Sequence, residues 1–339
     1  MTVTNLAAQA ANTATQILAA IAIKAAMPKM VLYSLVHQDD LGNARTNTKR
    51  YMVNSDLGAA SAGAEGVALT PTVAIGMGTS VEQTVSEGVA DMALLTELMV
   101  STVLGLDMDT VQRIINEGTQ AQFESLFQPF IERMIPRGMQ KIEADLLALL
   151  SGLGGTAAGT TTADCTIANL IAVQYLYRIA QAPRPITEAR YLLAEIQAND
   201  VNTEALSTSG GLGGALWGSQ ANYGMANRPL DGVAVQVAGL LGSFLGYPVH
   251  SYDAELNVLA NADADVIGGF GVFGIPGVAP DASGVAGRPG AFNLLRRGGL
   301  KIRFNDKLEH RSAGLVMNAY YSPGEVVDRS VTPIITDAP

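Results

Sequence analysis

The longest hydrophobic pattern in this chain runs from Asp109 to Leu150. Its apolar residues recur three and four positions apart, the spacing that places side chains on one face of an α-helix. They are Val111, Ile114, Ile115, Phe123, Leu126, Phe127, Phe130, Ile131, Met134, Ile135, Met139, Ile142, Leu146, Leu147 and Leu150. No catalytic motif accompanies this pattern, so the predicted helix indicates architecture rather than chemistry.

Two prolines, Pro129 and Pro136, lie inside the helical pattern. A proline lacks the backbone N–H of the helix ladder and crowds the preceding turn, so it kinks or ends a helix. We therefore expect the helix to begin after Gly118, to span about residues 119–151 and to bend near Pro136. Gly152 follows at the position where glycine is typical of a helix stop.

The N-terminal segment predicts an extended arm, residues 1–36. Up to about residue 30 it consists mainly of Ala, Thr, Asn and Gln, and Pro28 closes this part. Such a segment cannot build a core by itself, so we expect it to lie against something else. Residues 31–37, an apolar run that closes near His37, predict a strand.

Residues 37–87 predict a long polar hairpin. An Asp-Asp-Leu-Gly turn signal is followed by a strand-like segment at 49–53 and by a stretch rich in Gly, Ala and Ser. Alternating apolar residues, Val73, Ile75, Val81 and Val85, indicate the returning strands. A two-stranded hairpin can bury few side chains by itself, so we expect this hairpin to pack against a neighbour.

Helices and strands alternate through the rest of the chain. The predicted helices are 90–106, 167–182 and a short one that ends at Leu206; the predicted strands are 190–196, 233–237, 249–252, 266–268, 300–304, 313–321 and 326–335. We expect the last two strands to pair across a Ser-Pro-Gly turn. Because no clean strand-helix-strand repeat appears, the pattern favours an α+β fold over a doubly wound sheet.

Chain length and composition indicate how many lobes to expect and which kinds of surface the apolar residues form. At 339 residues the chain exceeds the roughly 250 to 300 residues at which a single core usually stops growing, so we expect two or more lobes. Hydrophobic residues make up 48% of the chain but aromatic residues only 6%, and there are 36 glycines. Small apolar side chains suit sheets and subunit contacts better than a ligand pocket, which aromatic groups usually line.

The charge and the cysteine count exclude several classes. A net charge of −10 argues against a protein whose main work is to neutralise nucleic-acid phosphates. The lone Cys165 excludes an intrachain disulfide and a multi-cysteine metal site. The apolar run from Ile17 to Met27 is about half of the roughly 20 residues that a membrane crossing needs, and no basic leader precedes it. We therefore expect neither export nor a membrane span.

Residues that could carry catalysis or hold a metal form no motif. The three histidines, His37, His250 and His310, are far apart and fit no metal-binding spacing. Cys165 lies near a predicted helix start, where its pKa could fall, but no histidine is close in sequence. We therefore expect ordinary structural residues, and neither an enzyme nor a cofactor site.

Residues Gly269–Gly274 match the pattern G-x-G-x-x-G after a strand-like segment. The dinucleotide fingerprint requires a helix to begin there, so that its amides can hold a pyrophosphate. Pro276 and Pro280 are incompatible with that helix, and no acidic residue follows about 20 positions later, where the ribose ligand should be. We interpret the stretch as a glycine-rich loop or bulge.

Two segments carry a family likeness: Ala144–Gly152 (ADLLALLSG), at the end of the long helix, and Tyr320–Asp328 (YYSPGEVVD), near the C-terminus. With the order of arm, hairpin, long helix, mixed central part and closing strands, the chain resembles the major capsid proteins of tailed phages of the Hong Kong 97 type. The resemblance covers nearly the whole chain and rests on the order of its parts and on their residue patterns.

The resemblance implies a domain division and a function. The domains would be an N-terminal arm at 1–36, an E-loop hairpin at 37–87, a peripheral domain at 88–194 with the spine helix, an axial domain at 195–305, and C-terminal strands at 306–339 that return to the peripheral domain. The chain would be made in the host cytoplasm. It would self-assemble through hexamers and pentamers into an icosahedral virion shell that encloses double-stranded DNA.

The resemblance also implies partners. They would be further copies of the chain, a portal protein, and a separate scaffolding or decoration protein; the short N-terminal segment leaves no room for a fused scaffold of the usual kind. Candidate subunit-contact residues are Arg45, Lys49, Arg50, Tyr51, Arg137, Trp217, Arg296 and Arg297. Lys49 is the only hairpin lysine, and we favour ordinary ion pairs over the crosslink that some members of the family form through such a lysine.

Two alternatives remain open. An encapsulin-like nanocompartment shell would use the same fold and would carry a pocket for a cargo peptide. A nucleotide-binding enzyme, from a different class, would use the loop at Gly269–Gly274.

Overall fold

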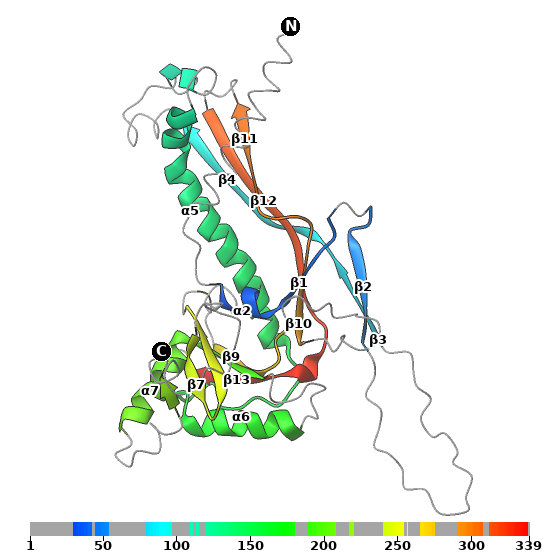
Figure 1. The fold of residues 1–339 in the computed structure, drawn as a ribbon, viewed down its shortest axis with the longest axis vertical. Helices are drawn as coiled ribbons and strands as arrows, with labels where there is room; N and C mark the ends of the chain where they lie inside the picture. Colours follow the sequence, from blue (N-terminus) through cyan, green and yellow to red (C-terminus); the bar gives the residue numbers. More distant parts are fainter. Residues whose placement is uncertain are drawn as a thin grey trace, which may run out of the picture.

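The computed structural model shows a long helix beside a five-stranded sheet, a six-stranded sheet at one end, and a separate two-stranded hairpin (Figure 1). The structure describes residues 30–42, 45–53, 79–96, 109–110, 113–114, 120–179, 189–207, 217–219, 240–253, 256, 265–274, 290–307 and 312–337. Within these ranges, no helix combines the length and the apolar character that a membrane crossing needs.

The longest element is helix α5, Gln120–Leu147, which continues into a 3-10 turn, η2, Ala148–Gly152. Its buried stripe consists of Phe127, Ile131, Met134, Ile135, Ile142, Leu146 and Leu147. The predicted helix beginning after Gly118 is therefore confirmed. The helix continues through both Pro129 and Pro136, so neither proline ends it; the bend near Pro136 stays a prediction.

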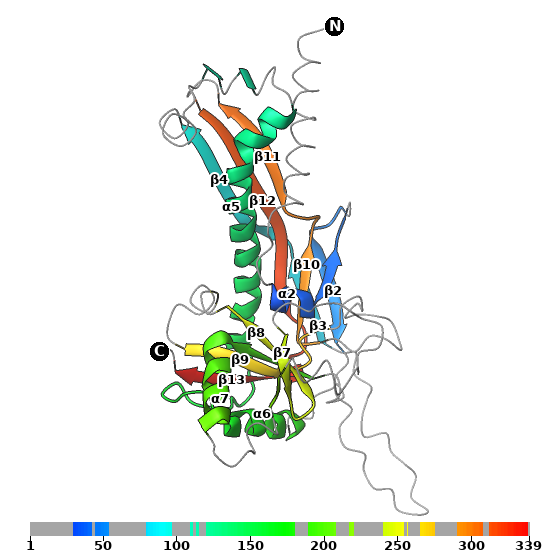
Figure 2. The same ribbon diagram turned by 60° about the vertical axis from the view of Figure 1, so that its left-hand side comes forward.

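The five-stranded sheet lies along α5 (Figures 1 and 2). Its strands are β1 (His37–Asp40), β4 (Ser86–Thr96), β10 (Phe292–Arg296), β11 (Lys301–Lys307) and β12 (Ser312–Glu325). Strand β12 pairs with β4 on one side and with β11 and then β10 on the other. Its buried residues, Leu315, Met317, Ala319 and Tyr321, alternate with more exposed ones, as a half-buried strand requires.

The six-stranded sheet has the order β13-β9-β5-β8-β7-β6. Its strands are β5 (Arg190–Ala194), β6 (Trp217–Ser219), β7 (Leu240–Phe244), β8 (Tyr247–Tyr252), β9 (Asp265–Gly271) and β13 (Val331–Asp337), and helices α6 (Ile167–Ile179) and α7 (Glu195–Ser207) accompany it. A cluster of rings fixes α6 on this sheet: the centroid of Phe270 lies 4.5 Å from that of Tyr191 and 5.4 Å from that of Tyr177.

The hairpin consists of β2 (Thr48–Val53) and β3 (Thr79–Thr84), which pair only with each other among the described strands. It stands beside the main body, next to β10 (Figure 2). Its polar, two-stranded form matches the prediction for the start and the return of residues 37–87; the tip between Val53 and Thr79 lies outside the described residues.

Two predictions of local structure were wrong. Residues Val31–Leu35 form a short helix, α2, rather than a strand, because α2 packs on α5 and its first amides find an acceptor there. Residues 90–96 belong to strand β4 rather than to a helix, because β12 pairs with them along the whole segment. The remainder of the predicted 90–106 helix, and the predicted strand at 233–237, lie outside the described residues.

The two C-terminal strands separate instead of pairing with each other, so the expected hairpin at 313–335 was also wrong. Strand β12 joins the five-stranded sheet and β13 pairs with β9 in the six-stranded sheet. A 3-10 turn, η5 (Asp328–Ser330), lies between them. The chain therefore crosses from one sheet to the other near its end. The domain boundaries themselves stay a prediction.

Candidate functional site

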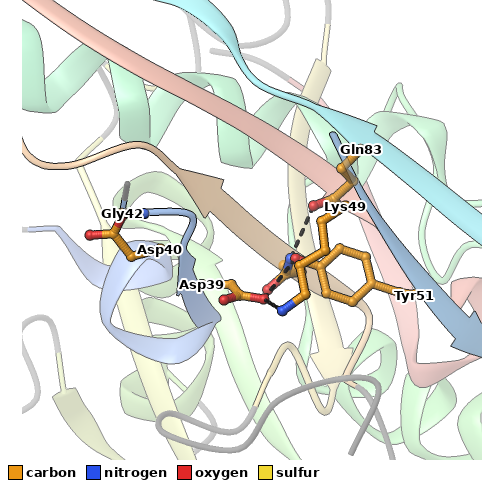
Figure 3. Close-up of polar contacts among 7 residues, drawn as sticks. Asp39, Asp40, Gly42, Lys49, Tyr51 and Gln83 are labelled. Carbon is orange, nitrogen blue, oxygen red and sulfur yellow. Dashed lines mark hydrogen bonds and ion pairs between the residues drawn. The ribbon is translucent and has the colours of Figure 1, made fainter. Parts of the chain in front are cut away.

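The base of the hairpin is held by a polar cluster around Asp39 of β1 (Figure 3). Its Oδ2 atom accepts hydrogen bonds from the ammonium of Lys49 and from the hydroxyl of Tyr51, the latter at 3.0 Å. The Lys49 Nζ atom also lies 5.4 Å from the centroid of the Tyr51 ring, within cation–π range. Tyr51 is fully buried. Strand β2 is thus attached to β1 through its side chains.

The second hairpin strand has its own attachment. The side-chain amide of Asn293 on β10 donates to Oε1 of Gln83 on β3, at 3.0 Å, and both residues are buried. Because a buried polar group without a partner is costly, this amide pair favours one position of β3 against the sheet. Both strands of the hairpin are therefore fixed to neighbouring strands of the five-stranded sheet.

Asp40, the neighbour of Asp39 on β1, binds backbone amides of two separate segments. Its Oδ1 atom accepts the backbone N–H of Gly298 at 3.0 Å and that of Gly42 at 2.8 Å. The hydrogen bond from Gly298, then that from Gly42, lower the pKa of Asp40, with a smaller contribution from the charge of Arg296. The guanidinium of Arg296 lies 3.9 Å from Asp40 and donates to the hydroxyl of Tyr33 at 3.0 Å.

A second polar attachment joins α2 to the long helix. Glu143 of α5 is fully buried, and its two carboxylate oxygens accept the backbone N–H groups of Leu32 at 2.6 Å and Tyr33 at 2.8 Å. Burial raises the pKa of Glu143 to about 7, against the opposing effect of these hydrogen bonds, and the charge of Asp253 raises it further. Glu143 thus supplies acceptors for the first amides of α2.

Comparison with known proteins gives structural neighbours only, since no family model and no curated protein sequence matches the chain. The capsid of a native GTA particle superposes with a TM-score of 0.51 at 12% identity, covering 92% of each chain. The mature capsid of bacteriophage PhiM1 gives 0.52 at 9% identity, covering 93% of this chain and 89% of that one. A structure of Mycobacterium phage Che8 gives 0.51 at 12%, covering 92% of each.

The chain has the Hong Kong 97-type capsid fold. We use the names predicted from the sequence and call α5 the spine helix and the β2–β3 hairpin the E-loop; the division into domains stays a prediction. We call the polar cluster around Asp39 the base of the E-loop, and Glu143 joins the spine helix to α2.

The structure brings four of the eight predicted contact residues together at the E-loop base: Lys49, Tyr51, Arg296 and Arg297. Each has a partner within the chain; the Arg297 guanidinium donates to the side-chain oxygen of Asn47. Their expected contacts with neighbouring subunits stay a prediction. Asp39, Gln83 and Glu143 were not predicted. The Asp-Asp-Leu-Gly signal predicted a turn at Asp39, but Asp39 lies in strand β1 and accepts hydrogen bonds from two side chains.

The other four candidates lie apart from this cluster. Arg50 points away from it on β2, where its Nε atom lies 2.5 Å from Glu82 of β3, and both side chains are largely exposed. Arg45 is exposed ahead of β2, and Arg137 is exposed on the spine helix. Trp217 is in β6, at the edge of the six-stranded sheet, and its side chain lies outside the described residues.

The glycine-rich stretch has a structural role. Gly269 and Gly271 belong to strand β9, so the expectation of a loop or bulge was wrong for this half of the stretch, whereas residues 272–274 lie outside the strand. Gly271 has a φ of +153°, and a Cβ atom on it would collide with the backbone oxygen of Ser330. A Cβ atom on Gly274 would lie 2.6 Å from Cα of Val36. These glycines permit close approach of neighbouring backbones, and the described residues 272–274 do not begin a helix that could hold a phosphate.

Cys165 is buried, and burial raises the pKa of its thiol to about 12, helped by the charges of Asp200 and Glu204. A thiol in this state is a poor nucleophile, because the thiolate is the reactive form. Among the described residues, no three His, Cys, Asp or Glu side chains gather in a way that could hold a metal ion.

Proposed function

We propose that this chain is the major capsid protein of a tailed phage. In this proposal it self-assembles through hexamers and pentamers into an icosahedral shell that encloses double-stranded DNA. The observation that carries it is the E-loop, a two-stranded ribbon that stands beside the main body with both strands fixed at the base (Figures 1 and 2). An isolated two-stranded hairpin is marginal in water, so such a ribbon calls for cover by other subunits.

The charge of the chain agrees with this role. The chain has a net charge of −10, and an acidic shell protein is not expected to bind phosphates tightly, so packaged DNA would stay free to enter and leave. The partners in this proposal are further copies of the chain, a portal protein, and a separate scaffolding or decoration protein. DNA is enclosed without sequence-specific contacts. The location is the virion capsid, after synthesis in the host cytoplasm.

A nanocompartment shell of the encapsulin type would use the same fold. We favour the phage shell because the neighbours named above include the capsids of a phage and of a GTA particle. The nucleotide-binding alternative has less support, because the glycines on which it depends lie in and beside strand β9, where they make close backbone contacts.

Sedimentation velocity of the purified protein tests the proposal. We expect a slow species of free subunits or capsomers together with a fast species of closed shells, in proportions that change with protein concentration and salt. A single compact monomer under all conditions would contradict it. Nucleic acid in particles purified from infected cells distinguishes a phage shell from a nanocompartment, in which we would expect a bound cargo protein instead.

A further inference from the structure

Helix α6 carries large apolar side chains on two opposite faces. The inner face, with Leu170, Val173 and Tyr177, is buried against the six-stranded sheet. The outer face is exposed: the exposed fraction is 47% for Ile171, 66% for Tyr175 and 56% for Ile179. These three residues follow each other at intervals of four, so they form one continuous stripe along the helix.

The surroundings of this stripe are small and almost uncharged. We call the α6 outer face the six exposed residues Ala168, Ile171, Ala172, Tyr175, Arg178 and Ile179. Arg178 is the only charged residue among the 13 of the helix. A helix that is apolar all round is normally buried all round, and a contiguous exposed apolar patch marks an interaction site. In the free chain the outer half of α6 is therefore exposed to solvent, although most of its side chains are apolar.

The size of the α6 outer face limits what can cover it. A helix of 13 residues is about 20 Å long. With a width of roughly 10 Å, its outer face offers roughly 200 Å², against about 800 Å² per partner in a standard stable interface. A contact of this area cannot hold a separate partner by itself. It can contribute where the same two molecules are also held by other contacts, as in a multivalent assembly.

The charge of the face favours a second copy of the chain as its occupant. Each copy has a net charge of −10, so contacts between copies are opposed by repulsion across most of their surface. The α6 outer face has no acidic residue, whereas the neighbouring helix α7 carries Glu195, Asp200 and Glu204. Copies can therefore meet through α6 at less electrostatic cost than through α7.

We propose that the α6 outer face packs against a neighbouring copy of this chain in the assembled shell, with Tyr175 at the centre of the contact. This inference rests on the proposed shell function and deepens it, because it names a surface that assembly buries. It also explains why the free chain tolerates three large exposed apolar residues on one helix.

Three variants test the proposal through assembly. Tyr175→Asp places a charge at the centre of the face, Tyr175→Phe keeps the ring, and Thr203→Asp adds the same charge at an exposed site on α7. We expect Tyr175→Asp to reduce the yield of shells at least tenfold, and the other two to assemble like wild type. All should unfold at the same midpoint as free subunits. Shells formed normally by Tyr175→Asp would overturn the proposal.

A labelling experiment measures the contact directly. Tyr175→Cys introduces an accessible thiol, while the natural Cys165 is buried and supplies the background. We expect a maleimide to label Cys at position 175 at least tenfold more slowly in shells than in free subunits. Equal rates in the two states would overturn the proposal while leaving the shell function intact. A wild-type chain that never forms shells would instead contradict the shell function.

Discussion

The carboxylate of Glu143 accepts the backbone N–H of Leu32 at 2.6 Å, across 111 positions of sequence. The same carboxylate accepts the N–H of Tyr33 at 2.8 Å. One buried side chain of the spine helix thus satisfies amides at the start of α2, the helix through which the N-terminal segment enters the fold. Besides the buried apolar side chains of α2, its attachment to the spine helix therefore includes a titratable group.

Glu143→Ala should destabilise the free subunit. The change leaves the amides of Leu32 and Tyr33 buried without their acceptor and opens a cavity. We expect the free energy of unfolding, measured by urea denaturation, to fall by about 2 to 4 kcal/mol. Glu132→Ala, at an exposed site on the same helix, is the matched control and should change it by less than about 0.5 kcal/mol. Equal effects of the two variants would contradict the role of Glu143.

The stability of the fold should fall as the pH rises, because burial disfavours the charged form of Glu143. The pKa of Glu143 is raised from 4.5 to about 7, so the folded chain holds this proton more tightly than the unfolded chain does. The stability that the group contributes is complete below about pH 4.5 and is lost as the pH approaches 7. Between pH 5 and pH 8, wild type should lose up to about 3 kcal/mol more stability than Glu143→Gln. Parallel pH profiles of the two proteins would exclude this linkage.

Tyr51→Phe should loosen the base of the E-loop. It removes the hydroxyl that donates to Asp39 while keeping the buried ring. We expect the free energy of unfolding to fall by about 1 to 2 kcal/mol and amide hydrogen exchange in β2 and β3 to become faster. Arg50→Met is the control, because it breaks only the exposed ion pair with Glu82 and should change stability by less than about 0.5 kcal/mol. If both variants exchange at the wild-type rate, the Asp39 cluster does not anchor the hairpin.

Shortening the E-loop should prevent assembly without preventing folding. Val53 and Thr79 are paired across the hairpin, so residues 54–78 can be replaced by a two-residue Asn-Gly turn. This deletion keeps Lys49, Tyr51 and Gln83 at the base. We expect a folded subunit with wild-type stability that forms no closed shells by electron microscopy. Normal shells from this variant would refute the role of the E-loop tip.

Long, strongly periodic segments could be predicted from the sequence. The spine helix, α6 and β12 each repeat one spacing over many residues, so the local pattern was enough. The short segment Val31–Leu35 could not be assigned in this way, since five residues, four of them apolar, suit a strand as well as a helix. Its conformation depends on Glu143, more than 100 positions away along the chain. Strand β4 contains helix formers such as Ala93 and Leu94, but its pairing with β12 overrides their preference.

The candidate site was predicted in part. The basic residues of the E-loop base stood out as clusters in the sequence. Their partners Asp39 and Asn47 could not be predicted, because only the strand pairings of the fold bring them together. Glu143 did leave a signal: it lies four residues after Met139 and three before Leu146, on the apolar stripe of the spine helix. A carboxylate at such a position predicts a buried polar contact.

Cryo-electron microscopy of the purified, assembled protein tests the central claim most directly. We predict closed icosahedral shells built from hexamers and pentamers, into which the described parts of the chain fit with the E-loop of each subunit lying on a neighbouring subunit. A protein that remains a compact monomer at every concentration and salt tested, with no shells, rings or tubes, would contradict the account.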